Sequence, residues 1–150
     1  MAVSAESLTR SVSAQRSRGR KVRRIRQNGA GKSMLCAAID IGSNTTRILV
    51  AEPDEGKLQK VMEQRAYTRI GQARLEDGSI PAEKIAEVSE VVETQVRLAR
   101  ELGAENFRAV ATAALRDAPN GKAAAEEIAA AAGIPVSVVS ENEEGRLAFL

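Results

Sequence analysis

LCAAIDIGSNTTRILVA, residues 35–51, is the stretch from which the rest of the fold can be worked out. Two apolar runs, residues 35–41 and 48–51, enclose a turn of glycine, serine, asparagine and threonine. Short apolar runs on both sides of such a turn predict a β-hairpin. A second turn at residues 53–56 and another apolar run at residues 58–62 predict a third strand.

Farther along the chain, the apolar residues change to a spacing of three or four, which is typical of an amphipathic helix. This pattern covers residues 81–102, with Pro81 suited to the first turn and Gly103 to the exit. The other expected elements are a strand at 107–112, a helix at 121–132, a strand at 134–139 and a helix from Ser140. The order β-β-β-α-β-α-β-α predicts an α/β domain with a mixed five-stranded sheet.

The composition removes several kinds of chemistry. The 150 residues contain no histidine, which excludes a catalytic triad, a histidine base and the usual zinc centres. Acid or base catalysis must then come from carboxylates or lysine. Cys36 is the single cysteine, and its apolar neighbours predict a small buried core residue in a reducing cytoplasm. No apolar run approaches the roughly 20 residues of a membrane span, so no membrane contact is expected.

Charge is distributed unevenly along the chain. Residues 1–33 hold nine lysines and arginines against one acid, whereas the remainder holds 13 basic and 19 acidic residues. The first segment is rich in serine, arginine and glycine without periodic apolar residues, which predicts a disordered basic tail. Its arginines favour nonspecific contact with nucleic acid, while the simpler interpretation is a solvated tail. Met34 is an alternative translation start to Met1, directly before the first predicted strand.

The first group of candidate functional residues is 40–46, where a carboxylate ends a buried strand and a polar turn follows. Backbone N–H groups and hydroxyls in such a turn suit an anion, and a carboxylate suits Mg²⁺. The structural alternative is an ordinary hairpin turn in which Asp40 accepts hydrogen bonds and Asn44 takes an unusual backbone conformation.

The second group is residues 112–120, which follow a predicted strand at the sheet edge where α/β proteins bind ligands. Arg116 could bind a phosphate oxygen in a bidentate manner. The alternative is a surface ion pair between Arg116 and Asp117, beside an ordinary turn at residues 119–121.

The third group is residues 140–146. Ser140 and Glu143 have the spacing of a helix capping box, which explains Glu143 structurally. The capping box does not need Glu144, so this carboxylate is expected to be free for another task. At the same sheet edge it could orient a water molecule for attack on phosphorus.

Together, the segments 38–47, 111–120 and 138–147 resemble the amino-terminal domain of the exopolyphosphatase/guanosine pentaphosphate phosphohydrolase (Ppx/GppA) family. The resemblance covers residues 34–150 and implies a ribonuclease-H-like fold of the actin-like ATPase superfamily. It implies hydrolysis of a terminal phosphoanhydride with Mg²⁺ as cofactor, in polyphosphate or guanosine pentaphosphate. By the same resemblance, Glu144 is the general base and Asp40 a metal ligand. The implied phosphate contacts are Gly42, Ser43, Asn44, Thr45 and Arg116.

The resemblance also implies a second domain with another glycine-rich phosphate loop, so the chain is expected to be C-terminally truncated and weak or inactive alone. One alternative is a noncatalytic phosphate- or nucleotide-binding regulatory module. Another is a phosphotransferase related to sugar or acetate kinases, for which residues 142–146 would not be expected. The choice of substrate and the oligomeric state, including a homodimer, are left open. The functional hypothesis requires Asp40 and Glu144 to converge on one anion pocket.

Overall fold

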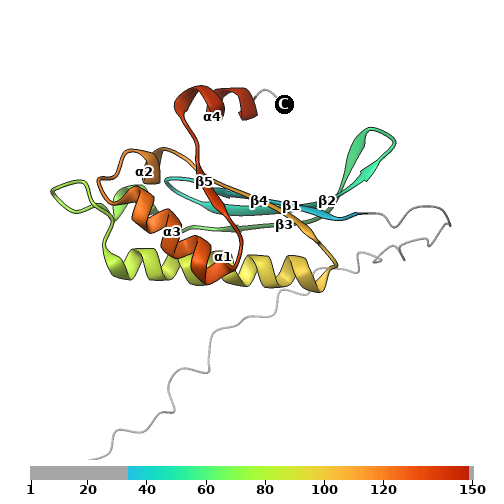
Figure 1. Cartoon of the computed structure of the whole chain (residues 1–150), viewed down its shortest axis with the longest axis horizontal. Coiled ribbons are helices and arrows are strands. Elements are labelled where there is room, and N and C mark those ends of the chain that lie inside the picture. Colours follow the sequence, from blue (N-terminus) through green and yellow to red (C-terminus); the bar gives the residue numbers. More distant parts are fainter. Residues whose placement is uncertain (1–33, 149–150) are drawn as a thin grey trace, which may run out of the picture. The chain divides into compact units, whose positions relative to one another are not determined.

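The computed structural model describes residues 34–148, which contain a five-stranded sheet in the order β3-β2-β1-β4-β5 (Figure 1). The strands are β1 (Cys36–Ile41), β2 (Thr46–Asp54), β3 (Lys57–Ala66), β4 (Asn106–Ala111) and β5 (Val136–Val138). β1 pairs antiparallel with β2 and parallel with β4. The expectation of a mixed five-stranded sheet is therefore confirmed. The predicted tail at residues 1–33, with its nucleic-acid contact, lies outside the described residues.

Helices lie on both sides of the sheet. Their bounds are α1 (Ala82–Glu101), α2 (Ala113–Arg116), α3 (Gly121–Ala132) and α4 (Glu141–Ala148), with a short 3-10 helix η1 (Ile70–Gln72). α1 and α3 pack together beneath the sheet, and α4 stands on the opposite side (Figure 1). The sequence pattern predicted α1, α3 and α4 but missed η1 and α2, because single helical turns are too short to show a helical period.

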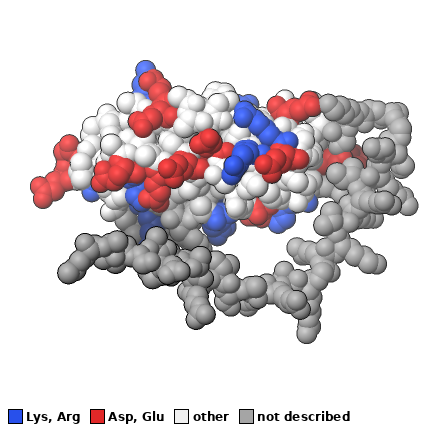
Figure 2. All heavy atoms as spheres, turned by 90° about the horizontal axis from the view of Figure 1, so that it is seen from below, with Lys and Arg blue, Asp and Glu red and all other residues white. Residues whose placement is uncertain are grey.

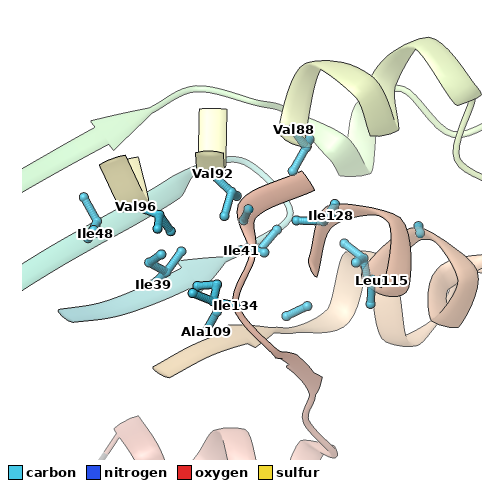
Figure 3. Close-up of a cluster of buried hydrophobic side chains, with 14 of the residues drawn as sticks. Ile39, Ile41, Ile48, Val88, Val92, Val96, Ala109, Leu115, Ile128 and Ile134 are labelled. Atoms are coloured by element: carbon cyan, nitrogen blue, oxygen red, sulfur yellow. The ribbon is translucent and has the colours of Figure 1, made fainter. Parts of the chain in front are cut away.

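The hydrophobic core fills the space between the sheet and the two helices beneath it. Alternate strand residues such as Ile39, Ile41 and Ile48 point toward α1, whose Val92 and Val96 meet them (Figure 3). These five side chains are almost completely buried. The apolar face of the strands, which follows a period of two residues, thus packs against the apolar face of α1, which follows a period of 3.6.

The opposite face of β1 explains one wrong expectation. Cys36 is only half-buried, although its apolar neighbours predicted a core residue. Because side chains alternate along a strand, Cys36 shares the face opposite α1 and α3 with Ala38 and Asp40, whereas Ala37 and Ile39 enter the core. An apolar run alone does not reveal which face of a strand is covered.

The solvent side of α1 carries exposed acids at Glu83, Glu87, Glu90 and Glu93. Figure 2, seen from the helix side, shows carboxylates in several separate groups with lysine and arginine side chains between them. Such a mixed charged surface is typical of a helix that faces water. Among the described residues, none of the helices combines the length and apolar character needed to cross a membrane.

Candidate functional site

A cavity of about 920 Å³ lies on the face of the sheet opposite α1 and α3. Asp40 at the end of β1 and Glu144 on α4 both contribute to its lining, so the two carboxylates share one pocket. Apolar side chains, including Leu49 and Val110, form its floor. The strand ends meet there because β1 and β4 run parallel and finish at the same sheet edge.

The turn after β1 contributes part of the wall. Gly42 and Ser43 line the cavity, whereas Asn44 and Thr45 are not among its lining residues. The backbone N–H of Gly42 donates to the carbonyl of Thr45 at 2.9 Å, which closes the turn. Asn44 does not have a positive φ, so the unusual backbone conformation considered for it is absent.

A segment that sequence reasoning missed supports this turn from behind. The N–H groups of Arg69 and Gly71 donate to the carbonyls of Asn44 and Ser43, at 3.0 and 2.9 Å. A Cβ atom on Gly71 would lie 3.3 Å from the Ser43 Cβ, so glycine allows this close approach. The sequence signal was an isolated glycine beside the buried Ile70, which is too common to single out.

Arg116 connects the segment after β4 to α4. Its Nη1 donates to Glu144 Oε2 at 2.8 Å, and its Nε donates to Asp117 Oδ1 at 3.1 Å. The expected surface pair with Asp117 is therefore present, but it is not the sole contact. Glu144 was expected to be free and is ion-paired instead, because the start of α4 lies directly above Arg116. Arg116 itself is not among the cavity-lining residues.

The predicted capping box holds the first turn of α4. Glu143 accepts from the Ser140 backbone N–H at 2.9 Å, and the Ser140 hydroxyl oxygen accepts from the Glu143 N–H at 3.3 Å. The backbone N–H and the hydroxyl of Ser140 both donate to the Glu143 carboxylate, and these two hydrogen bonds hold the pKa of Glu143 below its usual value. Glu143 is thus used structurally, and the helical turn that it stabilises carries Glu144.

The segment after β4 contains two further positioning contacts. Asn120 holds the backbone of Ile80 at both ends, accepting from its N–H at 2.9 Å and donating to its carbonyl at 2.8 Å. Arg74 Nη2 donates to the carbonyls of Ala113 and Ala114 at 3.2 and 2.7 Å. Both contacts hold the segment after β4 in place, and α2 within this segment carries Arg116.

The carboxylate of Asp40 lies where its negative charge is poorly solvated. Burial raises the pKa of Asp40 above its ordinary value, the positive charge of Arg47 opposes this, and the negative charge of Glu144 adds to it. A cation at this carboxylate would offset both unfavourable effects. Asp40 is therefore a suitable ligand for a metal ion, although its desolvated charge costs stability.

We expect Asp40→Asn to raise the free energy of unfolding at pH 7 in the absence of divalent metal. The raised pKa means that the folded state binds protons more tightly than the unfolded state, so the charged carboxylate reduces stability as pH rises. The advantage of the variant should disappear below about pH 4, where the unfolded carboxyl is also protonated. Urea unfolding of the native protein and the variant, at pH 7 and below about pH 4, measures this difference in stability. Equal stability of the two proteins at pH 7 would contradict the prediction.

Comparisons with known proteins identify the family. The model of the "Ppx/GppA phosphatase family" matches residues 49–150. The chain belongs to the Ppx/GppA phosphatase family. A guanosine-5'-triphosphate,3'-diphosphate pyrophosphatase of Vibrio parahaemolyticus is 30% identical over 115 residues, which cover 77% of this chain and 23% of that protein. An uncharacterized protein of Streptomyces coelicolor is 29% identical over 117 residues, covering 78% and 35%.

Solved Ppx/GppA structures share the fold. The Aquifex aeolicus family member has a TM-score of 0.73 and 33% identity, covering 79% of this chain and 39% of the other. An exopolyphosphatase from Cytophaga hutchinsonii shows the same fold at 19% identity and a TM-score of 0.71, covering 76% and 36%. The ribonuclease-H-like architecture expected from the sequence is thereby confirmed. This Ppx/GppA chain spans only 23% to 39% of the length of these four relatives.

Proposed function

We propose that this chain supplies one wall of a site that hydrolyses the terminal phosphoanhydride of inorganic polyphosphate or guanosine pentaphosphate. The observation that carries the proposal is the position of Asp40 and Glu144, which are far apart in the sequence and line one cavity beside Gly42 and Ser43. Family membership and the pyrophosphatase relatives support the reaction class. The substrate belongs to the proposal, because the chain matches only part of those proteins.

In the proposed reaction Glu144 accepts a proton from the attacking water, and Arg116 binds a phosphate oxygen. Phosphoryl transfer needs mainly positioning and charge neutralisation from the protein, which one carboxylate and one guanidinium can provide together. Ser43 is exposed and offers its hydroxyl to a second phosphate oxygen. Gly42 shapes the turn, since its N–H is already used within it. Contacts from Asn44 and Thr45 stay predictions.

Mg²⁺ is the cofactor that we propose, held by Asp40 together with substrate oxygens. Magnesium in phosphate-transfer sites usually takes one or two carboxylates and completes its shell with phosphate and water. Within residues 34–148, no cluster of three or more metal-ligating side chains of the histidine, cysteine or acid type is found, which fits a shell completed by the substrate. When bound, the ion would neutralise charge on the phosphate oxygens.

Phosphate release tests the proposal directly. The purified chain is incubated with Mg²⁺ and either long-chain polyphosphate or guanosine pentaphosphate, and inorganic phosphate is measured over time. We expect slow release above the protein-free rate, because this chain supplies only one wall of the proposed site. Release of phosphate from one substrate and not the other would name the substrate. Absence of both release and binding would contradict the proposal.

A noncatalytic phosphate-binding module is the second candidate. The ion pair between Arg116 and Glu144 favours it, because the acid proposed as base already has a cationic partner. Such a module would bind tripolyphosphate without releasing phosphate. Binding measured beside the release assay therefore separates the two candidates.

The cellular location is part of the same proposal. We place the reaction in a reducing cytoplasm, since the single thiol of Cys36 is half-exposed and persists best where thiols stay reduced. A homodimer and a nucleic-acid contact through residues 1–33 stay predictions.

A further inference from the structure

Arg116 faces more negative charge than it can neutralise. Its Nη1 contacts Glu144 at 2.8 Å, its Nε contacts Asp117 at 3.1 Å, and its Nη2 lies 3.8 Å from Glu141. Hydrogen bonding to Glu144, followed by that to Asp117, raises the pKa of Arg116 above its ordinary value. One guanidinium thus has three competing carboxylates, and it can lose one of them without being left unpaired.

Two of these residues have conflicting tasks in the proposed reaction. Arg116 is needed by a phosphate oxygen and Glu144 by a water molecule, yet the two side chains are hydrogen-bonded to each other. Glu144 lines the cavity, whereas Arg116 is not among the lining residues and has 20% of its side chain exposed. A phosphate oxygen that binds Nη1 of Arg116 therefore competes with the Glu144 carboxylate.

We propose that Arg116 exchanges partners on substrate binding: a substrate phosphate displaces the Glu144 carboxylate from Arg116 and frees it for water. The inference rests on the proposed function and adds a switch to it. No covalent bond changes in this step. Asp117 on Nε and the Val139 carbonyl, 3.4 Å from Nη1, keep the guanidinium oriented during the exchange.

The exchange also affects how α4 is attached. Among the described residues, the side-chain hydrogen bonds and ion pairs that join α4 to segments other than its own capping residue Ser140 all end on Arg116. Figure 1 shows α4 standing apart from the sheet, joined to it through the segment after β5. Displacement of Glu144 would leave the weaker contact of Glu141 with Arg116 and the capping hydrogen bonds to Ser140, so α4 could adjust its position when phosphate binds.

Calorimetric titration with inorganic tripolyphosphate, in EDTA and without metal, tests the exchange. Glu144→Gln removes the competing charge at nearly constant size, and we expect the Kd to fall about two- to fivefold, the range of a partly exposed ion pair. Glu141→Gln is the matched control, because it makes the same change beside the same guanidinium at a longer distance. It should have a smaller effect. In an Arg116→Gln background, Glu144→Gln should bring no gain.

Equal gains from the two glutamine variants, or a gain that persists without Arg116, would reflect charge removal alone and overturn the inference. If Arg116→Gln does not fold, carbon NMR of the native chain at fixed pH tests the partner exchange instead. The Glu144 carboxyl resonance should then move on addition of tripolyphosphate, and by more than that of Glu141; an unmoved resonance overturns the inference. Absence of tripolyphosphate binding in the native chain both without metal and with Mg²⁺ would instead overturn the proposed function itself; if binding requires Mg²⁺, the same variants are compared in Mg²⁺ buffer.

Discussion

Replacing Glu144 by glutamine is expected to lower phosphate release from polyphosphate by about 10²- to 10⁴-fold, the usual contribution of a general base. The amide has nearly the size of the carboxylate but cannot accept a proton from water. The fold should survive, because the lost ion pair with Arg116 is partly exposed and contributes little to stability. Initial rates of phosphate release, with circular dichroism to check folding, measure both effects.

Glu141→Gln is the control for this experiment. The Glu141 side chain is 85% exposed and lies on the same helical turn, so its variant should release phosphate at nearly the native rate. Equal rates for native protein and Glu144→Gln would remove Glu144 from the mechanism. Tighter tripolyphosphate binding together with lost turnover in Glu144→Gln would support both the role of Glu144 as general base and the partner exchange of Arg116.

Gly121→Ala is expected to destabilise the protein by about 3 kcal/mol or more, at the upper end of the range for overpacking. A Cβ atom at this position would lie 1.6 Å from the carbonyl oxygen of Leu115 and 2.6 Å from its carbonyl carbon. These are backbone atoms of α2 and cannot turn aside as a side chain can. Relief requires α2 to move away from α3, and with it Arg116.

Gly145→Ala provides the matched comparison. Gly145 lies within α4, and its added Cβ would meet nothing within 4 Å. Alanine is favoured over glycine in a helix by about 0.5–1 kcal/mol, so this variant should lose no stability. Urea unfolding followed by circular dichroism measures both proteins. A native unfolding midpoint for Gly121→Ala would show that α2 tolerates displacement, contrary to this prediction.

The fold was predictable because its signals are local. The alternation around residues 35–51 and the three-to-four spacing of residues 81–102 each report how one element buries its apolar face. The capping box at Ser140 and Glu143 was predictable for the same reason, since both partners lie within one helical turn. β5 was predicted too long, as residues 134–139 instead of Val136–Val138, because an apolar run does not show where pairing ends.

The contacts around the candidate site were not predictable, because they join segments distant in the chain. The support of Ser43 by Gly71 and the bidentate contact of Asn120 with Ile80 depend on loops that meet only after the sheet forms. The burial of Cys36 depended likewise on which face of β1 the helices cover. The spacing of residues in the sequence carries no information on contacts between distant segments.

By itself, then, the sequence determined the order of elements, the exclusion of histidine chemistry and the acids available to a phosphate site. Only the tertiary structure decided that Asp40 and Glu144 line one cavity and that Glu144 is paired with Arg116. The physical reason is that periodicity records the burial of each element separately. The partner of a charged side chain is set by the packing that brings α2 beneath α4.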